Sequence, residues 1–222
     1  MKRHFLISIC IALFGVISLN AQNLDQELWA DINASKKLFK NADLGVEVGF
    51  RMDNGMSSPK ITYFEPDFSY EIFKNFEAAL SYRYSILPGA TPNSENRLAL
   101  ALSYEVEVGK VDISYRTKFQ QDYIPANSNE PVWRNKLKFD YNMSKKLDPF
   151  LATELFYDAG TGREFEQFRV VVGAEIDLPK GKDVSVYYML RNKFNVGNPG
   201  NIHVIGVSFN FGKIKKRDKG DE

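Results

Sequence analysis

Residues 166–194 read EQFRVVVGAEIDLPKGKDVSVYYMLRNKF, and side chains of two kinds alternate along this stretch. Apolar residues occupy every second position over 168–176, and charged residues such as Arg169 and Glu175 stand between them. The same alternation resumes after the chain breaker at 179–182. Because successive side chains of a β-strand point to opposite faces, the stretch predicts a β-hairpin whose strands each have one apolar and one charged face.

The arms of this hairpin are long, at about a dozen residues each, whereas strands in soluble proteins usually have about five or six. Strands of this length can cross the tilted wall of an outer-membrane barrel. Alternating segments recur along the whole chain, and the weakest is the one after Pro149, where Phe150 and Phe156 share a face with Glu154. With the hairpin they make eleven: 27–34, 43–52, 63–72, 77–86, 97–108, 111–119, 133–141, 149–157, the two hairpin arms and 205–211.

Two regularities extend over these segments. Tight turns near Lys36, Lys74, Gly109, Lys145 and Lys180 alternate with longer loops at 53–60, 88–96, 122–131, 158–164 and 195–201. Short periplasmic turns and long external loops are typical of outer-membrane barrels, as are aromatic girdles on the apolar face. Such aromatic residues are Tyr82, Tyr84, Tyr104, Tyr115, Phe119, Trp133, Tyr141, Tyr188, Phe209 and Phe211.

We therefore predict an all-β fold, an antiparallel transmembrane β-barrel of ten to twelve strands. The alternative is an exported soluble sandwich or lipocalin-like barrel, whose strands also alternate but are shorter. Eleven segments conflict with the even strand number of bacterial single-chain barrels. Either the first segment lies outside the wall, or residues 149–165 contain a split or missed strand.

The N-terminal residues are typical of a secretory signal. Two basic residues, Lys2 and Arg3, precede an apolar run of about fifteen residues, which ends before Ala21. Cleavage after Ala21 leaves a barrel domain over 22–212 and a basic tail over 213–222, and removes Cys10. The remainder has 27 of the 29 basic residues against 28 acidic ones, so its charge argues against a nucleic-acid partner.

Several short motifs resemble a known family. They are Leu28-Trp29, Phe50-Arg51, the stretch 149–157 (PFLATELFY), the stretch 166–169 (EQFR) and the stretch 203–206 (HVIG). Together they resemble DUF2490, a family of predicted outer-membrane proteins of Bacteroidetes. The resemblance spans most of the mature chain and implies a barrel in the outer membrane, inserted by the barrel assembly machinery. It implies no activity and no catalytic residue.

The polar faces of the strands predict what lines the interior. Basic residues lie nearer the long loops, and acidic residues, including Glu154, lie nearer the tight turns, with Glu65 as an exception. Guanidinium groups bind carboxylate and phosphate bidentately, and a focused field concentrates anions. The candidate anion path consists of seven arginines: Arg51, Arg83, Arg97, Arg116, Arg134, Arg169 and Arg191. The alternative is a closed structural or interaction barrel in which these side chains pair with carboxylates and fill the lumen.

Enzyme and metal chemistry find little support. The mature chain has one histidine, His203, whose position in the alternation puts it on the lipid-facing side without a serine two residues away. A lipid hydrolase would need both groups together; an outer-membrane lipid hydrolase is therefore the least favoured alternative function, and we predict no catalytic residue. One histidine and no cysteine also exclude a zinc site of the usual kind, and we predict no cofactor. The expected partners are outer-membrane lipid and small anionic solutes.

Overall fold

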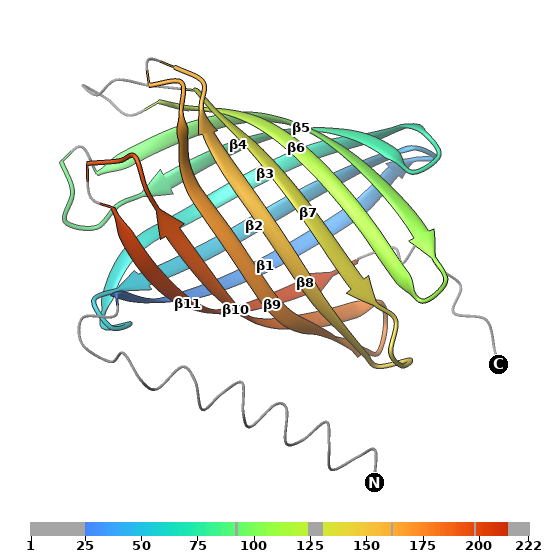
Figure 1. The fold of residues 1–222 in the computed structure, drawn as a ribbon. Coiled ribbons are helices and arrows are strands. Elements are labelled where there is room, and N and C mark those ends of the chain that lie inside the picture. Colours follow the sequence, from blue (N-terminus) through green and yellow to red (C-terminus); the bar gives the residue numbers. More distant parts are fainter. Residues whose placement is uncertain (1–24, 92, 124–130, 161, 198, 213–222) are drawn as a thin grey trace, which may run out of the picture.

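The computed structural model describes residues 25–91, 93–123, 131–160, 162–197 and 199–212. In these residues, eleven strands form one closed β-barrel (Figure 1), which confirms the predicted fold class. The predicted signal peptide at 1–21 and the basic tail at 213–222 lie outside the described residues. The strands are β1 (Asp25–Phe39), β2 (Ala42–Asp53), β3 (Ser58–Phe73), β4 (Phe76–Ile86), β5 (Ser94–Val108), β6 (Val111–Tyr123), β7 (Pro131–Tyr141), β8 (Leu147–Asp158), β9 (Phe165–Leu178), β10 (Lys182–Lys193) and β11 (Gly200–Phe211).

An odd number of strands closes the barrel through one parallel pair. Each strand is antiparallel to its neighbours in the chain, but β1 and β11 pair parallel, from Asp25 opposite Ile202 to Ala34 opposite Phe211. The first strand therefore belongs to the wall, and residues 149–165 hold a single strand, β8, followed by a loop. Both explanations offered for the odd count are thus wrong, because parallel pairing of the first and last strands closes an eleven-stranded sheet.

The connections differ between the two ends of the barrel. One end has the tight turns at 40–41, 74–75, 109–110, 142–146 and 179–181, and the other has connections at 54–57, 87–93, 159–164 and 194–199. The turn predicted near Lys36 and the loop predicted over 53–60 are corrected here, because Lys36 pairs with Leu44 and Met52 pairs with Pro59. In both places the strands stay paired beyond the apolar segment, because this pairing satisfies the hydrogen bonds of the backbone N–H and C=O groups.

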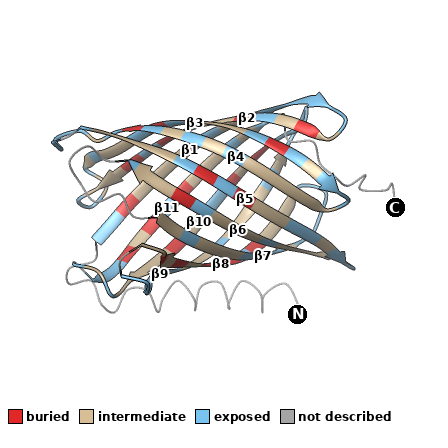
Figure 2. Ribbon diagram, turned by 90° about the horizontal axis from the view of Figure 1, so that it is seen from above, coloured by how far each residue is buried: buried red, intermediate tan, exposed pale blue. Residues whose placement is uncertain are grey.

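Burial is inverted relative to a soluble protein. Phe64, Leu100 and Val172 are about half exposed on the outer face, whereas Glu27, Glu65 and Glu154 are buried inside. Figure 2 shows buried and less buried positions alternating along the strands. The exposed aromatic residues include nine of the ten predicted for the girdles: Tyr82, Tyr84, Tyr104, Tyr115, Phe119, Trp133, Tyr141, Phe209 and Phe211. A soluble barrel would bury these apolar faces, so the soluble alternative does not fit.

Within the described residues, no helix is long and apolar enough to cross a membrane.

Candidate functional site in the barrel lumen

A cavity of about 750 Å³ occupies the lumen and is lined by all seven arginines of the predicted anion path. We call it the basic cavity. Eleven basic side chains line it: Arg51, Lys60, Arg83, Arg97, Arg116, Lys118, Arg134, Lys136, Lys138, Arg169 and Arg191. Seven carboxylates line it as well: Glu27, Asp31, Glu47, Glu65, Glu95, Glu154 and Glu175.

A second cavity, of about 560 Å³, lies toward the tight turns. We call it the acidic cavity, because its charged lining consists of Lys138 and nine carboxylates: Asp43, Glu47, Asp67, Glu77, Glu105, Asp112, Asp140, Asp148 and Glu175. Glu47, Lys138 and Glu175 line both cavities, so the two adjoin. The lumen is therefore ordered by charge along the barrel axis.

Like charges face each other across neighbouring strands in the basic cavity. Arg83 is the register partner of Arg97, and Arg169 is the register partner of Arg191. On β6 and β7, two further pairs stack in a ladder: Arg116 opposite Lys136, and Lys118 opposite Arg134. Like charges directly opposite one another destabilise a sheet, so this arrangement requires negative charge from elsewhere.

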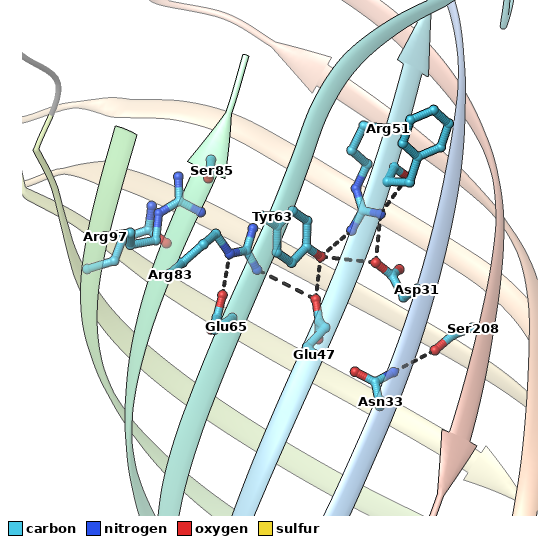
Figure 3. A network of polar contacts seen from close by, with 12 residues as sticks. Asp31, Asn33, Glu47, Arg51, Tyr63, Glu65, Arg83, Ser85, Arg97 and Ser208 are labelled. Carbon is cyan, nitrogen blue, oxygen red and sulfur yellow. Dashed lines mark hydrogen bonds and ion pairs between the residues drawn. The ribbon is translucent and has the colours of Figure 1, made fainter. Parts of the chain in front are cut away.

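Tyr63 organises the part of the basic cavity at β1–β3 (Figure 3). Its hydroxyl accepts a hydrogen bond from Arg51 Nη2 at 2.6 Å and lies between the carboxylates of Asp31 and Glu47. Arg51 also pairs with Asp31 at 2.6 Å, and the Arg83 guanidinium lies over the Tyr63 ring, 3.6 Å from its centroid. These contacts hold both arginines against the wall, since each polar group has a partner there.

Three carboxylates each serve several cations. Glu27, only 1% exposed, pairs with Lys60 at 2.7 Å and with Arg191 at 2.8 Å. Glu65 pairs with Arg83 on the neighbouring strand and with Lys118 at 3.3 Å, three strands away. Contacts of this kind tie strands that do not share backbone hydrogen bonds.

Glu154 on β8 is the third of these carboxylates. It lies 2.8 Å from Arg134 Nη2, 3.4 Å from Arg169 Nη1 and 3.8 Å from Arg116 Nη2. The prediction that Glu154 belongs to the acidic group near the tight turns is wrong, because Glu154 lies among the arginines of the basic cavity. One buried carboxylate thus compensates part of the charge of three guanidinium groups.

Two cations are left less compensated than the rest. The Arg116 side chain is 39% exposed, whereas the other six arginine side chains are 10–18% exposed. Its neighbour Lys136 has no carboxylate within 4.0 Å among the described residues. Arg116 and Lys136 are therefore adjacent cations that line the cavity beside one shared carboxylate, Glu154, which lies 3.8 Å from Arg116 and is the register partner of Lys136 on β8.

The sequence matches a known family over most of its length. Residues 26–201 fit the profile of a family described as "Protein of unknown function (DUF2490)". The chain belongs to the DUF2490 family. A search of curated proteins found no match.

A solved porin structure shares the fold of this DUF2490 protein. The NanC porin has 11% sequence identity and a TM-score of 0.55, and the match covers 84% of this chain and 99% of that one. Two autotransporter domains match as well. The translocator domain of NalP from Neisseria meningitidis has a TM-score of 0.39 at 13% identity, covering 76% of this chain and 73% of that one. The β domain of the Bordetella autotransporter BrkA has 0.41 at 10%, covering 76% and 79%.

His203 of the DUF2490 barrel lies on the lipid-facing side, as its parity predicted. Its Nδ1 is 2.5 Å from the Tyr188 hydroxyl, and this tyrosine also faces outward. No serine hydroxyl hydrogen-bonds to His203 in the described part of the chain. The described residues also contain no group of three His, Cys, Asp or Glu side chains placed to hold a metal ion. The charged lumen is therefore the candidate site.

The sequence predicts the arginines of the DUF2490 lumen but not five of their carboxylate partners: Glu27, Asp31, Glu47, Glu95 and Asp122. A partial signal was available for Asp31, because Trp29 stands opposite Arg51 and Asp31 follows two residues later on the same face. Partners such as Glu65 for Lys118 have no such signal, since their strands do not pair.

Proposed function

We propose that this DUF2490 protein is exported to the outer membrane and passes small anionic solutes through the basic cavity. Support for the membrane comes from the apolar outer face, which would otherwise be in contact with water over most strands. The fold shared with the NanC porin is consistent with it. Support for anions comes from the excess of cations in the lining of this cavity.

The observation that carries the proposal is the Arg116–Lys136 pair. Two cations stand side by side on β6 and β7, and the nearest carboxylate to Arg116, at 3.8 Å, is already shared with Arg134 and Arg169. An anion between these side chains would relieve their repulsion and gain charge-assisted hydrogen bonds. Each of the other six arginines of the predicted path has a carboxylate oxygen at 3.4 Å or closer.

The negative charge of the acidic cavity opposes anion passage, so its effect must be compared with that of the positive charge in the basic cavity. Its carboxylates stand near the turns, for example Asp43 next to 40–41 and Asp112 next to 109–110. Charges at a wet mouth are screened over about 8 Å at physiological salt. Arg116, in the middle of β6, acts in a region of lower effective dielectric, where the same charge has a larger effect. We therefore expect the basic cavity to determine selectivity.

The test is conductance of the reconstituted full mature chain in a planar bilayer under a KCl gradient. The wild type is expected to favour chloride, and Arg116→Gln/Lys136→Gln is expected to lower the chloride-to-potassium permeability ratio by about fivefold. In this variant Glu154 still forms its ion pairs with Arg134 and Arg169, so the charges along the wall remain compensated. Lys40→Gln/Lys74→Gln removes the same charge from exposed tight-turn positions and should leave the ratio unchanged.

A second candidate is the closed structural or interaction barrel. It is favoured by the carboxylates shared across strands, such as Glu65 between Arg83 and Lys118. The same recordings separate the two functions. Folded protein that inserts but carries no current would support the closed barrel and overturn the proposed channel. A double variant with the selectivity of the wild type would overturn the role given to Arg116 and Lys136. Cation selectivity in the wild type would also overturn anion passage.

A further inference from the structure

The basic cavity has an apolar side as well as a charged one. Met189, Ile202 and Val204 form a buried hydrophobic cluster on β10 and β11, and Trp29, Val171 and Tyr187 pack against it. Trp29, Val171, Tyr187 and Met189 also line the basic cavity. In the closed ring of eleven strands, β10 is four places from β6 in one direction and seven in the other. The apolar patch therefore lies largely across the lumen from Arg116.

Three aromatic rings in the lumen each occupy the place of a missing side chain. A Cβ on Gly49 would lie 2.1 Å from Tyr63 Cζ, one on Gly173 would lie 2.7 Å from Phe150 Cζ, and one on Gly206 would lie 2.0 Å from Tyr187 Cζ. In each pair the glycine is the register partner of the aromatic residue. The rings therefore lie against the barrel wall, with one face toward the lumen.

Among the described residues, cations lie over two of these three rings and not over the third. The Tyr63 ring is covered by Arg83 at 3.6 Å, and the Phe150 ring by Lys138 Nζ at 4.7 Å. No described cation lies over Tyr187, and its hydroxyl makes no hydrogen bond within the described chain. Tyr187 thus lines the same cavity as Arg116 and Lys136, with no described cation over its ring and no hydrogen bond from its hydroxyl to another described residue.

We infer that the solutes this cavity takes best are aromatic carboxylates. The inference rests on the proposed anion passage and names its substrate class. The carboxylate would bind Arg116 and Lys136 through charge-assisted hydrogen bonds, and the ring would stack on Tyr187 beside the apolar patch. Stacked aromatic pairs contribute beyond the area that they bury, so the ring distinguishes these solutes from other carboxylates. A volume of about 750 Å³ accommodates one such molecule.

The test measures block of the chloride current through the full mature chain by two matched anions. Benzoate is the aromatic probe, and cyclohexanecarboxylate is a carboxylate of similar size without an aromatic ring. Benzoate is expected to halve the current at a concentration about fivefold lower than cyclohexanecarboxylate does. Tyr187→Leu should remove this difference, whereas Tyr187→Phe should keep it. Tyr188→Leu, the same change one residue along on the outer face, is the control.

The outcomes separate the two proposals. If the wild type selects chloride but both anions block it equally, aromatic recognition is overturned and anion passage stands. If Tyr187→Leu folds and keeps the full preference for benzoate, the assignment to Tyr187 is overturned. If the wild type carries no chloride-selective current, both fail. Should Tyr187→Leu not fold, the comparison of the two anions on the wild type and on Tyr187→Phe still decides the substrate class.

Discussion

At the scale of single residues, a few carboxylates determine which arginines belong to the wall and which face solutes. Glu154 contacts Arg134, Arg169 and, more distantly, Arg116. Alternation along β7 and β9 predicts that these arginines face the lumen, because parity alone fixes the face of a strand. Parity does not predict which of them is compensated. That depends on the register between neighbouring strands for Arg134 and Arg169, and on the stagger of β6 and β8, two places apart, for Arg116.

Glu154→Gln should destabilise the barrel strongly. The substitution leaves the shape almost unchanged but leaves buried guanidinium groups without their shared carboxylate. Removing one partner from a buried charge cluster costs about 3–5 kcal/mol. Urea unfolding in lipid vesicles, followed by tryptophan fluorescence, measures the change in the free energy of unfolding. Glu105→Gln, in the acidic cavity among like charges, is the control and should cost little. A Glu154→Gln barrel as stable as the wild type would contradict the role given to this carboxylate.

At the scale of elements, the alternation predicted the strands well and their ends poorly. The eleven segments correspond to the eleven strands, yet β1 continues to Phe39 and β3 begins at Ser58. Strand β8 departs from the pattern because Phe150 and Phe156 point inward. Phe150 lies beneath Lys138, and Phe156 lies beneath Arg134 and Arg169 at 4.6 and 4.2 Å. An apolar residue on a polar face is thus explained by cation–π contact, which hydropathy does not register.

The pairing of β10 with β11 depends on Gly206, because the Tyr187 ring occupies the space that a side chain at this position would fill. Gly206→Ala puts a methyl group where the ring lies, and such overpacking costs about 1–3 kcal/mol. The same unfolding measurement should detect this loss, and adding Tyr187→Ala should restore part of it by removing the clash. Gly197→Ala, in a loop with no atom within 4 Å of the new methyl group, is the control. Equal stability of the Gly206→Ala and Gly197→Ala variants would show that the ring does not need the absence of a side chain at this position.

At the scale of the whole molecule, eleven strands put the two ends of the barrel chain on opposite sides. Asp25 begins β1 at the end with the longer loops, and Phe211 ends β11 at the end with the tight turns. If the tight turns are periplasmic, as in other outer-membrane barrels, the start of the barrel lies at the cell surface. The odd count could not be resolved from sequence, because a parallel closing pair has no signature in the alternation of either strand.

Single cysteines should report this orientation. The sequence has one cysteine, Cys10, within the predicted signal peptide, so a chain cleaved after Ala21 as predicted would carry no other cysteine. Thr91→Cys in the 87–93 loop and Asp25→Cys at the start of β1 should react with a membrane-impermeant maleimide on intact cells. Lys74→Cys, in a tight turn, should react only after the outer membrane is permeabilised. Labelling of Lys74→Cys but not of Thr91→Cys on intact cells would mean that the barrel has the opposite orientation.

The proposed function expects the basic cavity to make the barrel an anion-selective path. The most direct test is the zero-current potential of the wild-type barrel in a planar bilayer with unequal KCl concentrations on the two sides. The excess of cations in the basic cavity predicts a zero-current potential with the sign that chloride permeation gives. This potential should shift toward zero in Arg116→Gln/Lys136→Gln. A zero-current potential with the sign that potassium permeation gives would contradict the proposed anion path, and so would the absence of current from folded and inserted protein.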